Sequence, residues 1–199
     1  EIETNALIAE HAPLLAKATA NVGDPQVRHR GTLGGSIAHA DSAADTPSAL
    51  LAHGGRVVVR SADGGERVID STDLFTGFLE SDISDTEMIT EVRIPKATGQ
   101  GWGYQKFNRR AQDWAIVGVS AQRTGDGNGA RVSLVNMNPT PARAAGVEEA
   151  LAGGAGASDA AAAAAEGMEP SSDLNASVEY RQHLARVLTR RALNEAGIA

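Results

Sequence analysis

The stretch RGTLGGSIAHADSAAD, residues 30–45, says more about this chain than any other segment. Its glycines can adopt backbone angles with φ > 0 and let a ligand approach the main chain closely. Successive N–H groups in such a loop form a concave anion site that suits a pyrophosphate. The carboxylates of Asp41 and Asp45 follow, and they can accept hydrogen bonds from sugar hydroxyls. The stretch predicts a ligand-binding loop, and the alternative is a glycine-rich turn between two elements.

The glycines do not fit the two common nucleotide-binding motifs. The Rossmann fingerprint requires a strand before the glycines and a helix that opens at them. Here a helical stretch and the loop Gly23-Asp24-Pro25 come first. No Gly-Lys-Ser/Thr follows the glycines, so the stretch is not a phosphate-binding P-loop either.

Composition excludes several classes of function. The chain has 199 residues, a net charge of −7 and no cysteine. The negative charge disfavours a nucleic-acid partner, because phosphate binding depends on Lys and Arg, and no apolar run is long enough to predict a membrane span. Without thiolates the chain can neither form a disulfide nor ligate an iron–sulfur cluster. Its histidines are dispersed, which predicts no metal site.

The first half of the chain is expected to mix helices with strands. Apolar residues at helical spacing indicate helices, and β-branched runs indicate strands. In chain order we expect helices over 5–22 and 43–52, strands over 56–60 and 66–71 around a turn at 63–65, a helical turn over 73–79 and a strand over 87–95.

A composition shift at residues 96–101 predicts a domain boundary, which divides the chain into 1–98 and 99–199. Beyond it we expect strands over 102–108, 114–123 and 130–137, a hairpin loop at 125–129, a short helix from 146 to 151 and a later helical region capped by 171–173. The overall expectation is an α+β fold whose second half is a three-stranded antiparallel sheet covered by helices.

Two expectations concern the C-terminal segments. The alanine-rich run over 153–165 is expected to be a surface helix plus linker. In the last helix one apolar face is expected to consist of Tyr180, Leu184, Val187 and Leu188.

Several motifs occur in the order typical of one known family. The run from Thr32 to Asp45 resembles the second flavin-binding motif of the FAD subunit of molybdenum hydroxylases. Similarity to that family continues through GDPQVRHR at 23–30, RRAQDWA at 109–115 and NMNPTPAR at 136–143, and so covers most of the chain. The resemblance implies part of a FAD-binding domain of the molybdopterin dehydrogenase type at 1–98. A domain like the C-terminal domain of carbon monoxide dehydrogenase flavoproteins then follows at 99–199.

The resemblance also implies an earlier glycine-rich flavin motif. Too few residues precede Thr32 to hold it, and the numbering begins at Glu1 rather than at a methionine. We therefore expect the N-terminal part of the flavin domain to be missing from this sequence.

FAD is the cofactor that the resemblance implies. The residues it assigns to FAD are Thr32, Leu33, Gly34, Gly35, Ser36, His39, Asp41, Asp45, Ile89 and Lys106. The run from Thr32 to Ser36 corresponds to the pyrophosphate and flavin loop, with Ser where many relatives have Asn. Asp45 corresponds to an acid that contacts ribityl or ribose hydroxyls, and Lys106 to a lysine that approaches the flavin.

Alternatives to these assignments stay open. Asp45 is otherwise a helix N-cap, Asp41 an Asx turn and His39 a structural residue. Ile89 is also expected as a buried strand residue. A shift of one residue in the alignment would replace Lys106 by Gln105.

Two roles are open for Arg109 and Arg110 as well. One is to bind phosphate or acidic residues of a partner, and the other is to form an ion pair with Asp113. We favour the ion pair.

The function implied is electron transfer within a molybdenum hydroxylase. The expected partners are a large subunit that holds the molybdenum cofactor and a small subunit that holds iron–sulfur clusters. FAD would pass electrons from the clusters to an acceptor such as NAD, a quinone or oxygen, so no catalytic side chain is expected. A cytoplasmic location is expected. The alternatives are a flavin-free assembly or nucleotide-binding subunit and a stand-alone flavin oxidoreductase.

Overall fold

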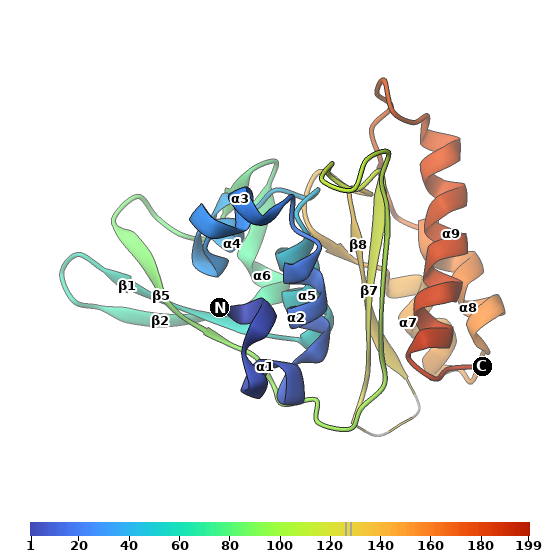
Figure 1. Ribbon diagram of the computed structural model, residues 1–199, viewed down its shortest axis with the longest axis horizontal. Coiled ribbons are helices and arrows are strands. Elements are labelled where there is room, and N and C mark those ends of the chain that lie inside the picture. Colours follow the sequence, from blue (N-terminus) through green and yellow to red (C-terminus); the bar gives the residue numbers. More distant parts are fainter. Residues whose placement is uncertain (126, 128) are drawn as a thin grey trace.

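The computed structural model describes residues 1–125, 127 and 129–199 and has one buried helix at its centre (Figure 1). This helix, α5 (Asp45–His53), is buried at all 9 positions. On one side it packs against β7 (Val117–Arg123) and β8 (Ala130–Val135). On the other side its Leu50 joins an apolar cluster with strand residues of a second sheet. A helix that is covered all round shows no solvent-exposed polar stripe, and the polar residues of α5, Asp45, Thr46, Ser48 and His53, are themselves buried.

The first half contains short helices and a 3-stranded antiparallel sheet in the order β2-β1-β5. Its helices are η1 (Ile2–Thr4), α1 (Ala6–His11), α2 (Pro13–Ala20), α3 (Pro25–Arg30), α4 (Leu33–His39) and α6 (Ser71–Leu74). Its strands are β1 (Arg56–Ser61), β2 (Glu66–Asp70), β3 (Phe75–Gly77), β4 (Glu80–Ser81) and β5 (Glu87–Arg93). The strands expected over 56–60, 66–71 and 87–95 are confirmed as β1, β2 and β5, to within two residues at each end. The turn expected at 63–65 joins β1 to β2.

Three expectations for the first half are wrong. The single helix over 5–22 is two helices, α1 and α2, because Pro13 lacks an N–H and disfavours helical angles at the residue before it. Helix α3 was not expected, although Asp24 caps it through its carboxylate and Pro25 begins it. The helical turn over 73–79 is limited to α6 and gives way to β3 at Phe75.

The second half is built on a 4-stranded antiparallel sheet in the order β6-β7-β8-β9. Its elements are β6 (Trp102–Phe107), β7, β8, β9 (Ala142–Arg143), α7 (Ala145–Ala152), α8 (Ala157–Ala162), η2 (Ala163–Ala165) and α9 (Val178–Glu195). The three expected strands are present, and the two-residue β9 adds a fourth at the edge of β8. Two residues of the expected hairpin loop, Asp126 and Asn128, lie outside the described part of the chain.

The faces of this sheet are covered by helices from different parts of the chain (Figure 1). Helices α2 and α5 lie against one face, and α9 and α7 against the other. Helix α9 approaches β6 closely, because a Cβ on Gly103 would lie 2.0 Å from the carbonyl oxygen of Ala192. Glycine is therefore required at the contact between strand and helix.

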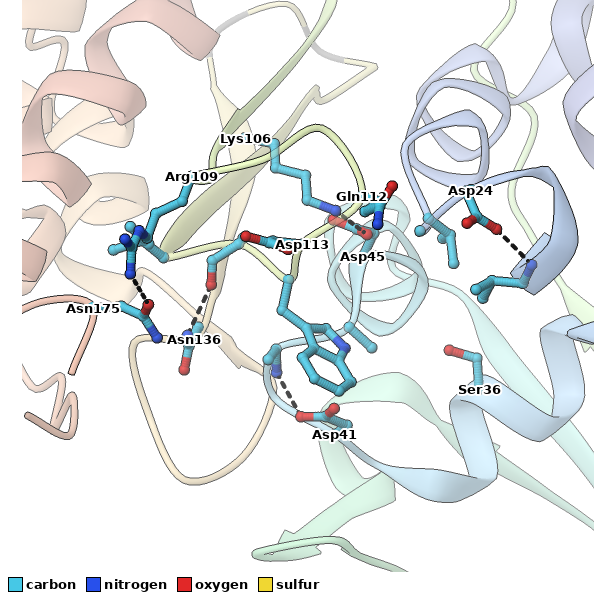
Figure 2. A pocket seen from close by; sticks show the side chains of 18 of the residues that line it. Asp24, Ser36, Asp41, Asp45, Lys106, Arg109, Gln112, Asp113, Asn136 and Asn175 are labelled. Carbon is cyan, nitrogen blue, oxygen red and sulfur yellow. Dashed lines mark hydrogen bonds and ion pairs between the residues drawn. The ribbon is translucent and has the colours of Figure 1, made fainter. Parts of the chain in front are cut away.

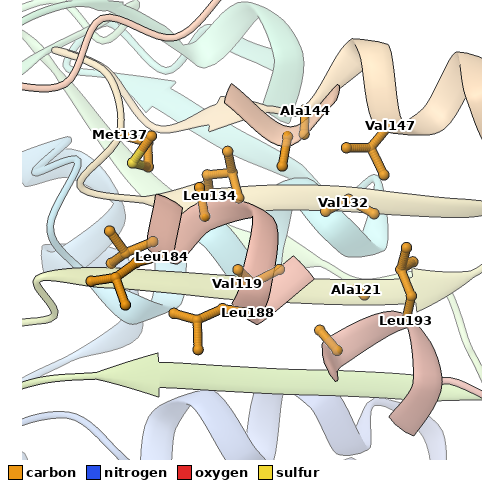
Figure 3. Close-up of a cluster of buried hydrophobic side chains, with 14 of the residues drawn as sticks. Val119, Ala121, Val132, Leu134, Met137, Ala144, Val147, Leu184, Leu188 and Leu193 are labelled. Carbon is orange, nitrogen blue, oxygen red and sulfur yellow. The ribbon is translucent and has the colours of Figure 1, made fainter. Parts of the chain in front are cut away.

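The C-terminal helices form one apolar core with the sheet (Figure 3). The alanine-rich run is not a surface linker, since Ala157, Ala160 and Ala164 are buried in this core. Alanine is the side chain that lets α8 and η2 lie close to α9, with which both are in contact.

The expected face of the last helix is correct in part. Leu184 and Leu188 are buried, whereas Tyr180 is 43% exposed and Val187 is half-buried. Arg181 is buried in place of Tyr180. The cap of this helix is Ser177, whose hydroxyl accepts the N–H of Tyr180, so the cap expected at 171–173 is wrong.

Candidate functional site

A cavity of about 740 Å³ lies between the helices of the first half and the loops of the second half (Figure 2). Cavities of about 300–1,000 Å³ are typical of small-molecule and cofactor sites. The expected site residues that line it are Ser36, His39, Asp41, Asp45 and Lys106. Residues that are remote in the sequence, from α4 to β6, thus meet around one space.

The glycine run folds as the beginning of helix α4, not as a loop. Gly34 and Gly35 lie in its first turn, and neither has a positive φ. Thr32 is the N-cap, and its hydroxyl accepts the N–H of Gly35 at 3.0 Å. The expectation of a loop with φ > 0 is therefore wrong, because a threonine at the N-cap favours the start of a helix.

The two glycine positions differ in whether the surrounding structure excludes a side chain. A Cβ on Gly35 would lie 2.7 Å from the hydroxyl oxygen of Thr32, so a side chain there would disturb the cap. A Cβ on Gly34 would meet nothing closer than Ile89, at 3.9 Å. Neither backbone angle nor packing within the chain requires glycine at Gly34, which leaves the space over it open to a ligand.

The remaining residues of the expected flavin loop sit beside the cavity rather than in its wall. Leu33 and Ile89 are half-buried and pack against the apolar cluster around Ile37. Ile89 is a strand residue as expected, but it is half-buried, so the expectation of a buried residue is correct only in part. Helix α4 contacts β5, so its first turn and Ile89 form one continuous surface next to the cavity.

Ser36 and Asp41 line the cavity, and each side chain already accepts one hydrogen bond from within the chain. The hydroxyl of Ser36 accepts a hydrogen bond from the Thr46 hydroxyl at 2.7 Å. One carboxylate oxygen of Asp41 accepts the N–H of Ala43 at 2.8 Å, which forms the Asx turn that we kept as an alternative. His39 ends α4 at the same wall.

Asp45 lies at the centre of a buried polar group. Its carboxylate accepts the hydroxyl of Tyr104 at 2.6 Å and the ammonium of Lys106 at 2.8 Å, one on each oxygen. Lys106 also donates to the carbonyl oxygen of Asn21 at 2.8 Å. The helix cap is Ala44, so the interpretation of Asp45 as an N-cap is wrong.

Burial dominates the electrostatics of this group. The side chains of Lys106 and Asp45 are only 6% and 5% exposed. Burial raises the pKa of Asp45, while the charge of Lys106 and the hydrogen bonds from Lys106 and Tyr104 oppose that rise. Burial and the neighbouring carboxylate also raise the pKa of Tyr104, so the phenol stays a donor.

The choice between Lys106 and Gln105 follows from the alternation of β6. Tyr104 and Lys106 share one face of the strand, the face that meets α5. Gln105 points the other way and donates to Glu195 of α9. Lys106 is therefore the residue at the cavity.

The loop between β6 and β7 forms the second wall. Arg109 donates to the side-chain oxygen of Asn175 at 3.3 Å, and no ion pair joins Arg109 or Arg110 to Asp113 among the described residues. The ion pair that we favoured is thus wrong. Trp114 was expected in a strand, but it lies in this loop at the cavity with 73% of its surface exposed.

Among the cavity residues that were not expected as site residues, Asn136 and Arg181 hold the walls together. Asn136 has φ = +60° and donates to the carbonyl oxygen of Ala115, which ties the two loops together. Arg181 is 1% exposed and pairs with Asp173 at 2.7 Å, and it also donates to the carbonyl oxygen of Ile116. Asn136 stands in the motif at 136–143, so that motif offered a signal. Arg181 offered none, because a lone arginine on a helix is most often solvated.

The described residues contain no group of His, Cys, Asp or Glu side chains that could hold a metal ion. In the same part of the chain no helix is long and apolar enough to cross a membrane.

Comparison with protein families gives two matches. Residues 1–97 match the family described as "FAD binding domain in molybdopterin dehydrogenase". Residues 102–196 match the "CO dehydrogenase flavoprotein C-terminal domain".

Individual relatives match almost the whole chain. The nicotine 6-hydroxylase medium subunit of Paenarthrobacter nicotinovorans is 38% identical over 96% of this chain and 69% of its own length. The carbon monoxide dehydrogenase medium chain of Hydrogenophaga pseudoflava is 33% identical over 98% of this chain and 71% of its own length. A solved structure of carbon monoxide dehydrogenase from Hydrogenophaga pseudoflava superposes with a TM-score of 0.92 at 34% identity, covering 100% of this chain and 72% of that one.

Proposed function

The chain belongs to the FAD-binding medium subunits of the molybdenum hydroxylases, and from this premise we propose that it binds FAD at the cavity beside Lys106 and transfers electrons through it. The observation that carries the proposal is the convergence of Ser36, His39, Asp41 and Asp45 with Lys106 around one space. FAD supplies a redox group that accepts electrons singly and releases them in pairs.

The residues present fit a dinucleotide cofactor in size and chemistry. The cavity volume lies in the range of cofactor sites. Cationic side chains, carboxylates and the Ser36 hydroxyl line it, and the first turn of α4 with Gly34 and Gly35 lies next to it. A Cβ on Gly34 would meet nothing closer than Ile89, at 3.9 Å, so the missing side chain leaves room for a bulky pyrophosphate against this backbone.

We assign the roles as follows. The run from Thr32 to Ser36 holds the pyrophosphate and Ile89 lies against the flavin. Asp41 and Asp45 accept hydrogen bonds from ribityl or ribose hydroxyls, since a carboxylate has about four acceptor sites. Lys106 has three N–H groups, of which two are engaged by Asp45 and Asn21. The third is available to the flavin, where a cation favours the reduced state. His39 adds a further polar contact.

We also propose that the chain acts within a larger complex. It has no cysteine, so clusters that feed electrons to FAD must be ligated by another polypeptide. A large subunit with the molybdenum cofactor would oxidise the substrate, and an external acceptor would take the electrons from FAD. The proposed boundary between the two domains falls between residues 98 and 99.

The flavin content of the purified native complex tests the proposal. We expect one FAD per chain, bound non-covalently and released on denaturation, since no cysteine can form a thioether link. A complex without flavin absorption would favour the flavin-free assembly subunit instead. Reduction of the bound flavin by the substrate of the complex, followed in its visible absorption, tests the electron path.

A further inference from the structure

We infer that Tyr104 is a positioning residue, which fixes the charge of Lys106 toward the flavin by holding the Asp45 carboxylate that lies between them. This inference rests on the proposed function, because it concerns the same site. Tyr104 does not line the cavity, and it acts through two other side chains.

The arrangement follows from the spacing of β6. Residues two apart on a strand lie on the same face, so Tyr104 and Lys106 both point at the first turn of α5. There each binds a different oxygen of Asp45, at 2.6 and 2.8 Å. With an oxygen held from each side, the carboxylate cannot rotate without breaking a buried hydrogen bond.

A lysine needs such fixed acceptors. Its four-carbon stem is flexible and its ammonium is a point charge, so the acceptors determine where it sits. Asp45 and the carbonyl oxygen of Asn21 together hold Lys106 and leave one N–H for the cavity. Loss of the Tyr104 hydroxyl frees one side of this arrangement, while the phenyl ring keeps its place in the apolar cluster that also contains Ala49 and Leu15.

The hydroxyl also keeps the carboxylate ionised, since its hydrogen bond lowers the pKa of Asp45 against the effect of burial. Without that donor the carboxyl group takes up a proton more readily and holds Lys106 less firmly. The ammonium is then no longer fixed toward the cavity, so the flavin experiences a weaker positive charge, which disfavours its reduced state.

The test is a comparison of Tyr104→Phe with the wild-type complex. We expect weaker flavin binding, by about 3- to 10-fold in Kd, since Tyr104 acts on the flavin only through Asp45 and Lys106 and the net contribution of a typical hydrogen bond has this order of effect. We also expect a lower flavin midpoint potential. Tyr180→Phe is the matched control, because the Tyr180 ring packs edge-on against Phe107 and is half-exposed.

A double variant separates positioning from packing. If Tyr104 acts through Lys106, then Tyr104→Phe added to Lys106→Met changes the potential no further than Lys106→Met alone. If the shift in potential of the double variant equals the sum of the two single shifts, the inference is overturned. An unchanged potential and Kd in Tyr104→Phe would overturn it as well. A wild-type complex that lacks flavin would instead overturn the proposed function.

A second measurement guards against a Tyr104→Phe protein that does not fold. Fluorotyrosine incorporated in a Tyr180→Phe background keeps the ring and the hydroxyl at position 104 but makes the hydroxyl a stronger donor. We expect the midpoint potential to rise relative to the same protein with ordinary tyrosine. No change in the potential would contradict the inference.

Discussion

At the scale of single residues, Gly34 shows how a ligand is inferred from a side chain that is absent. The fold explains Gly35 through the Thr32 cap and explains Gly103 through the approach of α9. It gives no reason for Gly34, whose φ is not positive and whose Cβ would make only ordinary van der Waals contact with Ile89, at 3.9 Å. The backbone reason inferred for Gly34 from the sequence is wrong, because a T-x-G-G run is equally able to begin a helix, and its contact with FAD stays a prediction.

Gly34→Ala should therefore separate stability from flavin binding. Alanine in place of a helical glycine adds up to about 1 kcal/mol of stability, while the new methyl group should lower flavin occupancy. Thermal melts and bound flavin, measured on the same preparations, check both parts. Gly35→Ala is the comparison, and its disturbed cap should cost about 1 kcal/mol. Full flavin occupancy in Gly34→Ala would refute the placement of FAD against α4.

His53 is a residue whose role no sequence pattern predicted. It ends α5, is 2% exposed, and its Nε2 has no hydrogen-bond partner among the described residues. Burial, and secondarily the positive charge of Arg131, lower its pKa from 6.5 to about 4. Burial of this kind depends on tertiary packing, which a lone histidine in the sequence does not reveal.

The pH dependence of stability follows from this shift. A pKa that is lower in the folded state means that the unfolded chain binds the proton first as the pH falls. Stability is therefore lost between about pH 6.5 and pH 4, by about 3 kcal/mol at most. Urea unfolding across that window measures the free energy of unfolding at each pH. Its fall with decreasing pH should be less steep for His53→Gln than for wild type. The exposed residue His183, changed to Gln, should keep the wild-type slope.

At the scale of elements, strands were easier to predict than helix boundaries. β-branched runs with a turn between them indicated β1 and β2 directly, and the antiparallel order of β6, β7 and β8 followed from short connections. Helical periodicity gave no sign of the break at Pro13 that divides α1 from α2. The alanine-rich run looked like a linker because alanine has little apolar area. Its burial depends on how closely α8 packs on α9, which is a property of the assembled fold.

Helix α9 provides the test at this scale. Leu184 is 7% exposed in the core of the second half (Figure 3), so Leu184→Asp would bury a charge at a cost of several kcal/mol. We expect a large fall in the melting temperature of the full chain. Ala162 is exposed on α8, and Ala162→Ser should be nearly silent. Ala163, which lies nearby, is no suitable control, since it packs against the core. A Leu184→Asp protein that melts like wild type would show that α9 does not pack as described.

At the scale of the whole molecule, the site exists because α5 brings the two halves together. Its first residue, Asp45, meets β6 from the second half, and the cavity opens beside that contact. The α+β class was predictable from the sequence, since strands and helices were each visible locally. The cavity was predictable only through the family resemblance, because its walls come from segments between Val22 and Arg181 that no local pattern connects.

The proposed function depends on other polypeptides. If this chain transfers electrons through FAD as proposed, clusters that feed them must be held across an interface, because the chain has no cysteine. We therefore expect the native protein to elute as a complex with a molybdenum subunit and an iron–sulfur subunit, the three in equal amounts. Gel filtration followed by identification of the subunits and metal analysis checks this. Mild dissociation should leave the flavin with this chain and the iron and molybdenum with the others. A stable monomer that oxidises an organic substrate by itself would refute the assignment, since it would place the whole reaction on a chain with no ligand set for a cluster.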